Sequence, residues 1–282
     1  MKNNMKTILL VGVAAVVLIG YGAYKLCNKA ELQTPKIEAV KGAPTATKID
    51  EKFATLMTAI GQNAGVETVE VIIKSGADVN GTMPDGITPL MLACNENANV
   101  DIVKLLLANG ADAKTQNKYG INALSIAVLN NVAPEIIEML LQKGANPNVE
   151  IKKGWTLLMT ASAEGNLGLI KILLQNGADV NQKGKDGLTP LMIAGAKVYP
   201  EIILTLIENG AAINTKDAYG MTALMYACGG NSNPEIINIL LENGAQAKMR
   251  NNDGKTALDF AKRNPQLMDS PYYEKLEQQT IR

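Results

Sequence analysis

The chain has 282 residues, of which 47% are hydrophobic and only 4% aromatic, and its formal net charge is zero. This length suits a folded body of one or two domains packed through aliphatic side chains. Histidine is absent, which removes the commonest general base, proton shuttle and metal ligand and so disfavours an enzyme.

The zero net charge hides a division along the chain. Residues 1–48 hold seven Lys against Glu31 and Glu38, a net charge of +5, and the remainder carries −5. The N-terminal end is therefore a different kind of segment from the body that follows it.

Residues 7–24 form a run of 18 residues without a charge, between Lys6 and Lys25. As a helix this run spans about 27 Å, close to the thickness of the bilayer core. We therefore predict an N-terminal transmembrane signal anchor over residues 1–28. A cleaved signal peptide, with Gly20-Tyr21-Gly22 as its nearest cleavage site, and a lipoprotein signal at Cys27 are the alternatives.

Lysines on both sides of the apolar run nearly cancel the charge bias that sets membrane topology. Because long C-terminal domains translocate largely regardless of charge, we expect the body to be extracytoplasmic (periplasmic), anchored by a single pass. Residues 29–48 contain Pro35, Pro44 and scattered Lys without an apolar period, which predicts a flexible linker.

Two glycine ladders run through the rest of the chain with steps of 33 or 34 residues. The first is Gly86, Gly120, Gly154, Gly187, Gly220 and Gly254, and the second is the Gly-Ala pairs at Gly76, Gly110, Gly144, Gly177, Gly210 and Gly244. Two ladders with one period indicate a solenoid, in which each unit buries its apolar face against its neighbours.

Each period predicts a pair of helices. The first begins at a polar residue, often followed by Pro, as in Thr88-Pro89-Leu90 and Thr189-Pro190-Leu191. The second helices are predicted to begin at Val66, Val100, Pro134, Leu167, Pro200 and Pro234, and to end at the Gly of the Gly-Ala pair in a left-handed C-cap.

The period, the helix pair and the Thr-Pro-Leu-x-x-Ala and Leu-Leu-x-x-Gly-Ala motifs resemble the ankyrin-repeat family. With the apolar segment ahead of it, the chain is similar to a membrane-anchored ankyrin-repeat protein of bacterial type. The resemblance implies an all-α solenoid of helix-turn-helix repeats with β-turn or hairpin tips, over residues 49–282. We divide it into repeats at 50–84, 85–118, 119–152, 153–185, 186–218, 219–252 and 253–282, and expect the first and last to be polar caps, the last ending irregularly past Pro265 and Pro271.

One position departs from the family pattern. The His usual after Thr-Pro-Leu is replaced by Met57, Met91, Met159, Met192 and Met225, by Ser125 and by Asp259. Stacked helices lie roughly 8–10 Å apart, too far for successive Met sulfurs to share a copper ion, so we predict that these methionines fill the core. Cys94 and Cys228, four repeats apart, are likewise predicted to be small buried residues rather than a disulfide.

No nucleophile–base pair, Walker loop, dinucleotide fingerprint or Cys/His metal spacing appears in the sequence. We therefore expect no catalytic residue, no metal, no cofactor and no small-molecule substrate. Nucleic acid is disfavoured as a partner because the body carries −5.

The family resemblance implies that a partner docks on the turn tips and on the concave face of the first helices. The tips (81–85, 114–119, 148–153, 181–186, 214–219 and 247–253) hold nine basic and five acidic residues, which predicts a basic edge on an acidic body. The candidate partner-binding residues are Lys118, Tyr119, Lys152, Lys153, Trp155, Lys183, Lys185, Lys216, Tyr219, Lys248 and Arg250. The alternative is that the charged residues have no binding role and occur in these turns only because turns are exposed to solvent.

The sequence thus favours a non-enzymatic scaffold or adaptor for another protein with an acidic surface, presented at a membrane through residues 7–24. An inhibitor or protective accessory subunit of an extracytoplasmic enzyme is the alternative function.

Overall fold

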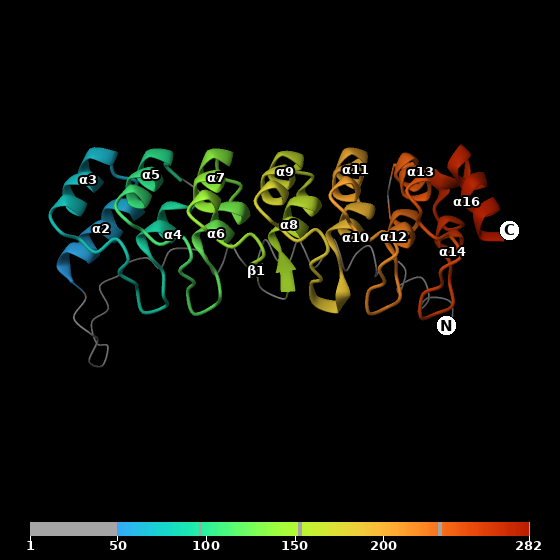
Figure 1. Ribbon diagram of the computed structural model, residues 1–282, viewed down its shortest axis with the longest axis horizontal. Coiled ribbons are helices and arrows are strands. Elements are labelled where there is room, and N and C mark those ends of the chain that lie inside the picture. Colours follow the sequence, from blue (N-terminus) through green and yellow to red (C-terminus); the bar gives the residue numbers. More distant parts are fainter. Residues whose placement is uncertain (1–49, 96–97, 152–153, 231–232, 282) are drawn as a thin grey trace, which may run out of the picture. The chain divides into compact units, whose positions relative to one another are not determined.

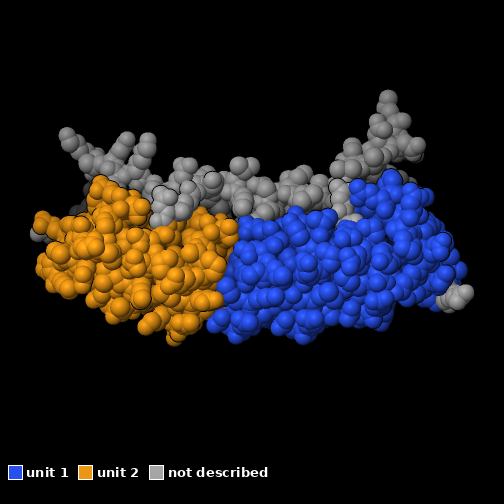
Figure 2. Space-filling view, turned by 90° about the horizontal axis from the view of Figure 1, so that it is seen from above, with its two compact units in different colours: residues 1–31, 153–282 blue, residues 32–152 orange. Residues whose placement is uncertain are grey.

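The computed structural model describes residues 50–281 except 96–97, 152–153 and 231–232. The predicted anchor and linker at 1–48 therefore lie outside the described residues. Within the described part, no helix combines the length and the apolar character needed to cross a membrane. The described residues fall into two compact units, unit 2 holding those up to 151 and unit 1 those from 154 onward, coloured separately in Figure 2.

Unit 2 is built from pairs of short helices, labelled in Figure 1. The first helix of each pair is α2 (Glu51–Gly61), α4 (Pro89–Ala93) or α6 (Ala123–Leu129), and the second is α3 (Val66–Lys74), α5 (Val100–Ala108) or α7 (Pro134–Gln142), followed by the strand β1 (Glu150–Ile151). First helices pack on first helices and second on second, α4 on both α2 and α6, and α5 on both α3 and α7.

Unit 1 repeats the same design. It contains β2 (Trp155–Thr156), α8 (Leu157–Glu164), α9 (Leu167–Gln175), the 3₁₀ turn η2 (Lys185–Gly187), α10 (Pro190–Gly195), α11 (Pro200–Glu208), α12 (Ala223–Gly229), α13 (Pro234–Glu242), α14 (Ala257–Ala261), α15 (Pro265–Met268) and α16 (Pro271–Ile281). The first helices α8, α10, α12 and α14 stack in order, and α9, α11 and α13 stack behind them.

The helix ends follow the predicted chemistry. All six second helices begin at the predicted residue. Where a first helix follows Thr88, Thr156, Thr189 or Thr222, the threonine hydroxyl accepts a hydrogen bond from a methionine backbone N–H, at 3.1–3.3 Å. The predicted left-handed C-cap is confirmed, for example at Gly110, where φ is 85° and a Cβ would meet no atom within 4 Å. Gly110 is thus required by the backbone rather than by packing.

The methionines of the first helices lie in the core, as predicted. Met91, Met159, Met192 and Met225 are each 1% exposed. Cys94 and Cys228 are buried free thiols, also as predicted, and burial raises the pKa of the Cys94 thiol to about 12. Burial raises the pKa of the Cys228 thiol as well.

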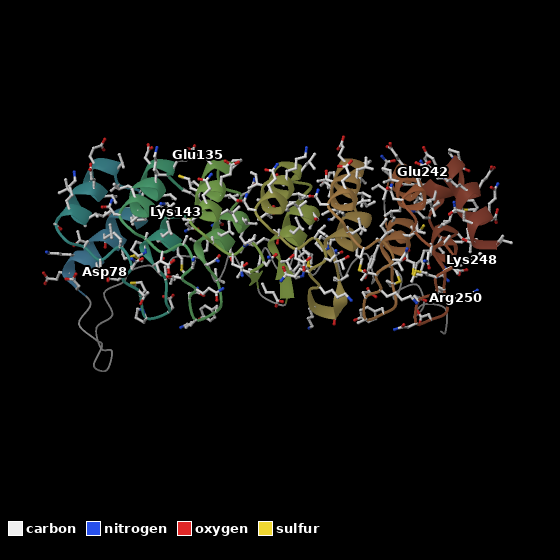
Figure 3. All side chains as sticks on the ribbon, in the orientation of Figure 1. Asp78, Glu135, Lys143, Glu242, Lys248 and Arg250 are labelled. Carbon is white, nitrogen blue, oxygen red and sulfur yellow. The ribbon has the colours of Figure 1, made fainter. Side chains whose placement is uncertain are left out.

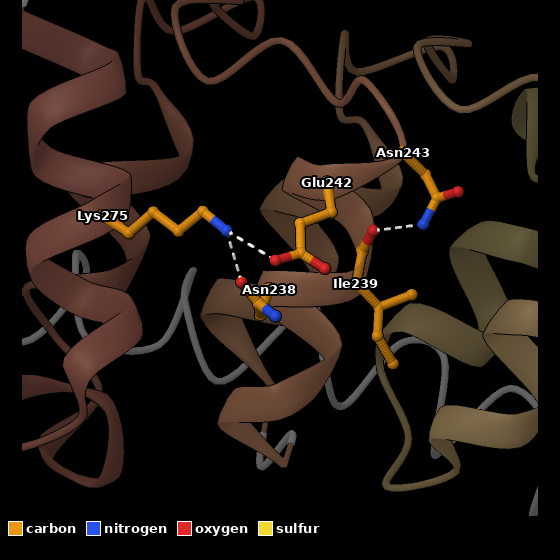
Figure 4. A network of polar contacts seen from close by, with 5 residues as sticks. All are labelled: Asn238, Ile239, Glu242, Asn243 and Lys275. Atoms are coloured by element: carbon orange, nitrogen blue, oxygen red, sulfur yellow. Dashed lines mark hydrogen bonds and ion pairs between the residues drawn. The ribbon is translucent and has the colours of Figure 1, made fainter.

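The C-terminal end is helical, and the expectation of an irregular end past Pro265 and Pro271 was wrong. Both prolines begin helices, because proline fits the first helical position, where its missing N–H is not needed. Leu276 of α16 is fully buried. The Nζ of Lys275 donates to Asn238 Oδ1 at 2.6 Å and to Glu242 Oε1 at 3.0 Å (Figure 4). The helix α16 therefore covers α13 and α14, and its remaining side chains are mostly polar.

Asp259, which replaces the family histidine in the last repeat, forms a capping box with Thr256. Its Oδ2 accepts hydrogen bonds from the Thr256 backbone N–H at 2.8 Å and from the Thr256 hydroxyl at 2.9 Å. The backbone hydrogen bond from Thr256 lowers the pKa of the Asp259 carboxyl below its ordinary value of 3.8. The negative charge of Asp259 therefore stabilises the C-terminal end.

This lowered pKa predicts a pH-dependent contribution. Stability supplied by Asp259 is fully present above the unfolded-state pKa and is lost as pH falls through the folded-state pKa. We expect Asp259→Asn to lower Tm at neutral pH, and the difference from wild type to shrink as pH falls below 3.8. Circular dichroism melts across this range measure the effect, with Asp253→Asn, an exposed tip acid, as control. A Tm difference that stayed constant across this range would contradict the assignment.

Candidate partner-binding edge

The turn tips are held rigid by a side-chain oxygen at the same place in three of them. In each, one Oδ1 atom accepts hydrogen bonds from the backbone N–H groups two and four residues further along the chain, at 2.8–3.0 Å. The accepting residues are Asn117, Asp217 and Asn251. This arrangement closes each tip on itself. The backbone of the exposed residues Tyr119, Tyr219 and Asp253, which supply the first donor of each tip, is therefore held in a fixed conformation.

Hydrogen bonds also join successive tips within each unit. In unit 2 the Lys118 N–H donates to Asp85 O at 3.2 Å, and in unit 1 the Ala218 N–H donates to Asp186 O at 2.7 Å. The Asn214 side chain ties its tip to the segment between α13 and the next tip, donating to Gly244 O at 2.9 Å and accepting from the Gln246 N–H at 2.8 Å. Asn80 and Asn181 make equivalent pairs of bonds. The tips of a unit thus form a connected edge.

One tip is also tied to its own first helix. Asp217, 7% exposed, accepts a 2.7 Å hydrogen bond through Oδ2 from the hydroxyl of Tyr226 in α12. Burial, and then this hydrogen bond, raise the pKa of the Tyr226 phenol. The phenol therefore stays protonated and keeps donating, and both oxygens of Asp217 are occupied.

In unit 2, two of the predicted site residues lie together. Tyr119 is 59% exposed, and the Nζ of Lys118 lies 5.1 Å from the centroid of its ring, within the range of a cation–π contact. The predicted residues Lys152 and Lys153 lie outside the described residues.

In unit 1 the remaining candidates are spread over the tips. Trp155 is half-buried at the start of β2, and Tyr219 is 60% exposed. The exposed cations are Lys183, Lys185, Lys216, Lys248 and Arg250. Figure 3 shows Lys248 and Arg250 on the loop side of unit 1, with Glu242 on the second helix α13.

The basic edge predicted from the whole chain is uneven in the described residues. In unit 2 the tip cations Lys114 and Lys118 are matched by Asp85 and Glu150. In unit 1 the exposed tip acids are Asp186 and Asp253, because Asp217 is buried. The excess of exposed positive charge therefore belongs to unit 1, and the burial of Asp217 enlarges it.

The first helices offer little surface beside the tips. All residues of α6 from Ala123 to Val128, all of α8 from Leu157 to Ala163 and all of α10 are buried. Among the described residues of these helices and tips, the exposed side chains therefore come mostly from the tips. These two surfaces could not be separated from the sequence alone, because small and polar residues occur on both.

Comparison with known proteins agrees with this architecture. Residues 56–151 and 133–217 match the family described as Ankyrin repeats (3 copies), and residues 206–261 match Ankyrin repeats (many copies). The crystal structure of the human ASB11 ankyrin repeat domain is similar, with 27% sequence identity and a TM-score of 0.64, over 79% of this chain and 96% of that chain. No curated protein matches the sequence. The repeat period, the capped helix pairs and these matches show that the chain belongs to the ankyrin-repeat family.

Proposed function

We propose that this protein is a non-enzymatic scaffold or adaptor that docks an acidic protein partner on its turn tips. Ankyrin repeats generally mediate protein–protein interaction, and the family resemblance extends that role to this chain. The observation that carries the proposal is the set of exposed tip cations beside the exposed Tyr219 in unit 1. Among the described residues, none of these cations is in an ion pair.

Electrostatics favours the tips over the second helices as the docking surface. The cations stand on tips whose backbone is held by hydrogen bonds, so little backbone entropy is lost when a carboxylate binds, and aromatic side chains next to basic ones are common anchors of interfaces. Five of the second helices carry an acid in the first turn, at Glu67, Asp101, Glu135, Glu201 and Glu235, which repels an acidic partner.

Crosslinking capture with charge-reversal variants tests the docking surface. We expect Lys183→Glu, Lys216→Glu and Arg250→Glu together to lower capture of the partner by about tenfold or more, because each reversal replaces attraction by repulsion. The matched control reverses three exposed lysines away from the tips, Lys104 in α5, Lys171 in α9 and Lys143 at the C-terminal end of α7, and is expected to capture normally. A second variant, Trp155→Ala with Lys153→Glu, examines the neighbouring tip. Equal capture by all variants would remove the tips as the docking site.

We also propose that residues 7–24 hold the protein at a membrane, with the body extracytoplasmic. The support is the uncharged 18-residue run and the Lys-rich residues around it. We expect the full chain to stay in the membrane fraction after carbonate extraction, and the body to be digested by protease added from outside. Full release by carbonate would contradict the anchor. Protection of the body from the external protease would show that the orientation is the opposite of the one proposed.

The alternative function, an inhibitor or protective accessory of an extracytoplasmic enzyme, differs in what is captured. If the crosslinked partner is an enzyme, adding the body to it would change its activity or its rate of inactivation. A scaffold would leave both unchanged.

A further inference from the structure

Three cations of unit 1 occupy the same position in consecutive repeats. Lys183, Lys216 and Arg250 are separated by 33 and 34 residues, the steps of the glycine ladders. The equivalent positions nearer the N-terminus hold Thr82, Gln116 and Glu150. The cationic column Lys183/Lys216/Arg250 is therefore confined to unit 1 and is not a general property of the repeat.

The column is exposed, and much of its hydrogen-bonding capacity is unused. Lys216 Nζ donates to the main-chain O of Arg250 at 2.8 Å, and Arg250 Nη1 donates to Gly254 O at 2.6 Å. An ammonium has three N–H donors and a guanidinium has five, so both groups keep donors free for a ligand. Lys183 makes no side-chain hydrogen bond or ion pair to any described residue.

The nearest acid on the middle tip does not neutralise the column. Asp217 follows Lys216 in sequence, but its carboxylate is buried. It accepts hydrogen bonds from the Tyr226 hydroxyl and from the backbone N–H groups of Tyr219 and Met221. The exposed Lys216 therefore makes no ion pair with Asp217, and the exposed ring of Tyr219 lies on the same tip.

The spacing of the column selects the conformation of a ligand. Stacked helices lie about 8–10 Å apart, so the backbones of successive column residues lie roughly that far from one another. A polyproline II helix has three residues per turn and rises about 3.1 Å per residue, which places every third side chain on one face about 9 Å apart. In a β-strand, residues three apart point to opposite faces, so a strand cannot present carboxylates in this register.

An aromatic ring on the middle tip favours the same conformation. Polyproline II segments dock on exposed aromatic side chains, which contact the proline rings. Tyr219 is 60% exposed, and its backbone N–H is held by Asp217 Oδ1 at 2.9 Å, so the ring stands on a fixed backbone.

We propose that the tips of unit 1 bind an acidic segment in the polyproline II conformation, with a carboxylate at every third residue. Successive carboxylates pair with Lys183, Lys216 and Arg250, and the intervening prolines contact Tyr219. This inference rests on the proposed function and narrows the partner to one chemistry.

Labelled peptides test the register on the full chain in detergent by fluorescence anisotropy. The probe has about five Glu-Pro-Pro units, and the matched control has the same composition with all Glu residues grouped at one end. A neutral control replaces Glu by Gln, and a helical control carries Glu at every seventh residue of an Ala-rich sequence. We expect the Glu-Pro-Pro probe to bind about tenfold or more tightly than each control, and its affinity to fall as ionic strength rises.

Substitutions in the column test whether the Glu-Pro-Pro probe binds there. Lys183→Glu, Lys216→Glu and Arg250→Glu together are expected to lower affinity for the probe by about tenfold or more, and Tyr219→Ala by about threefold to tenfold. The reversal of Lys104, Lys143 and Lys171 leaves affinity unchanged. Circular dichroism confirms that each variant is folded.

The outcomes separate this inference from the proposed function. If the grouped or the helical peptide binds as tightly as the probe, the register is wrong, although the tips still bind acid. If the probe fails to bind wild type while the tip reversals abolish partner capture, the proposed function stands and this inference fails. If the probe binds but the tip reversals leave partner capture unchanged, the proposed docking site fails.

Discussion

Replacing Met192 by alanine is expected to lower the free energy of unfolding by about 2–5 kcal/mol, the range for removing a large apolar side chain from a core. Met192 is 1% exposed in α10, a helix that packs on α8 and α12 within unit 1. Its truncation leaves a cavity between helices that are already fixed by their caps. Met192→Leu keeps nearly the same volume and is expected to cost less than about 1.5 kcal/mol.

Urea unfolding measures this difference, with a methionine of the same chain as control. Met268, at the end of α15, is 53% exposed, and Met268→Ala is expected to change the free energy of unfolding by about 0.5 kcal/mol or less. Equal effects at Met192 and Met268 would show that the methionines of the first helices are not core residues. The prediction matters for the fold because methionine stands where the family usually has a histidine that bonds between repeats.

The starts of the second helices could be predicted from the sequence because their signals are local. Proline at Pro134, Pro200 and Pro234 marks a first helical position, and the glycine ending each helix sits at the φ > 0 position that terminates it. Repetition strengthened each signal, since one ambiguous repeat could be read by comparison with the others. The buried methionines followed from the same periodicity.

The parts that could not be predicted depend on contacts between elements. Asp217 looks like any solvated turn acid in the sequence, and its burial follows from Tyr226, nine residues ahead, reaching back to it. The one available signal was a tyrosine where the other first helices have Leu, Ile, Thr or Phe. The burial of Asp217 enlarges the excess of exposed positive charge in the tips of unit 1. The helix α16 was missed because its sequence is polar and Leu276 alone is buried in it.

The bond between Asp217 and Tyr226 supplies the other large expected effect. Asp217→Ala removes the acceptor of a buried hydroxyl and of the backbone N–H groups of Tyr219 and Met221. Unsatisfied buried donors cost about 1–3 kcal/mol each, and a hydrogen bond to a charged group contributes about 1.5–3 kcal/mol. We expect a loss of about 2–4 kcal/mol in the free energy of unfolding, measured by urea denaturation.

A double-mutant cycle separates the two roles of Asp217. Asp217→Asn keeps the oxygen that accepts the tip N–H groups, as Asn117 and Asn251 do in their own tips, so it is expected to cost less than Asp217→Ala. Tyr226→Phe leaves one carboxylate oxygen buried without a donor and is expected to cost about 1.5–3 kcal/mol in wild type. In the Asp217→Asn background the same change is expected to cost less, because no buried charge is left unpaired. Additive effects in this cycle would mean that the hydroxyl and the carboxylate do not interact.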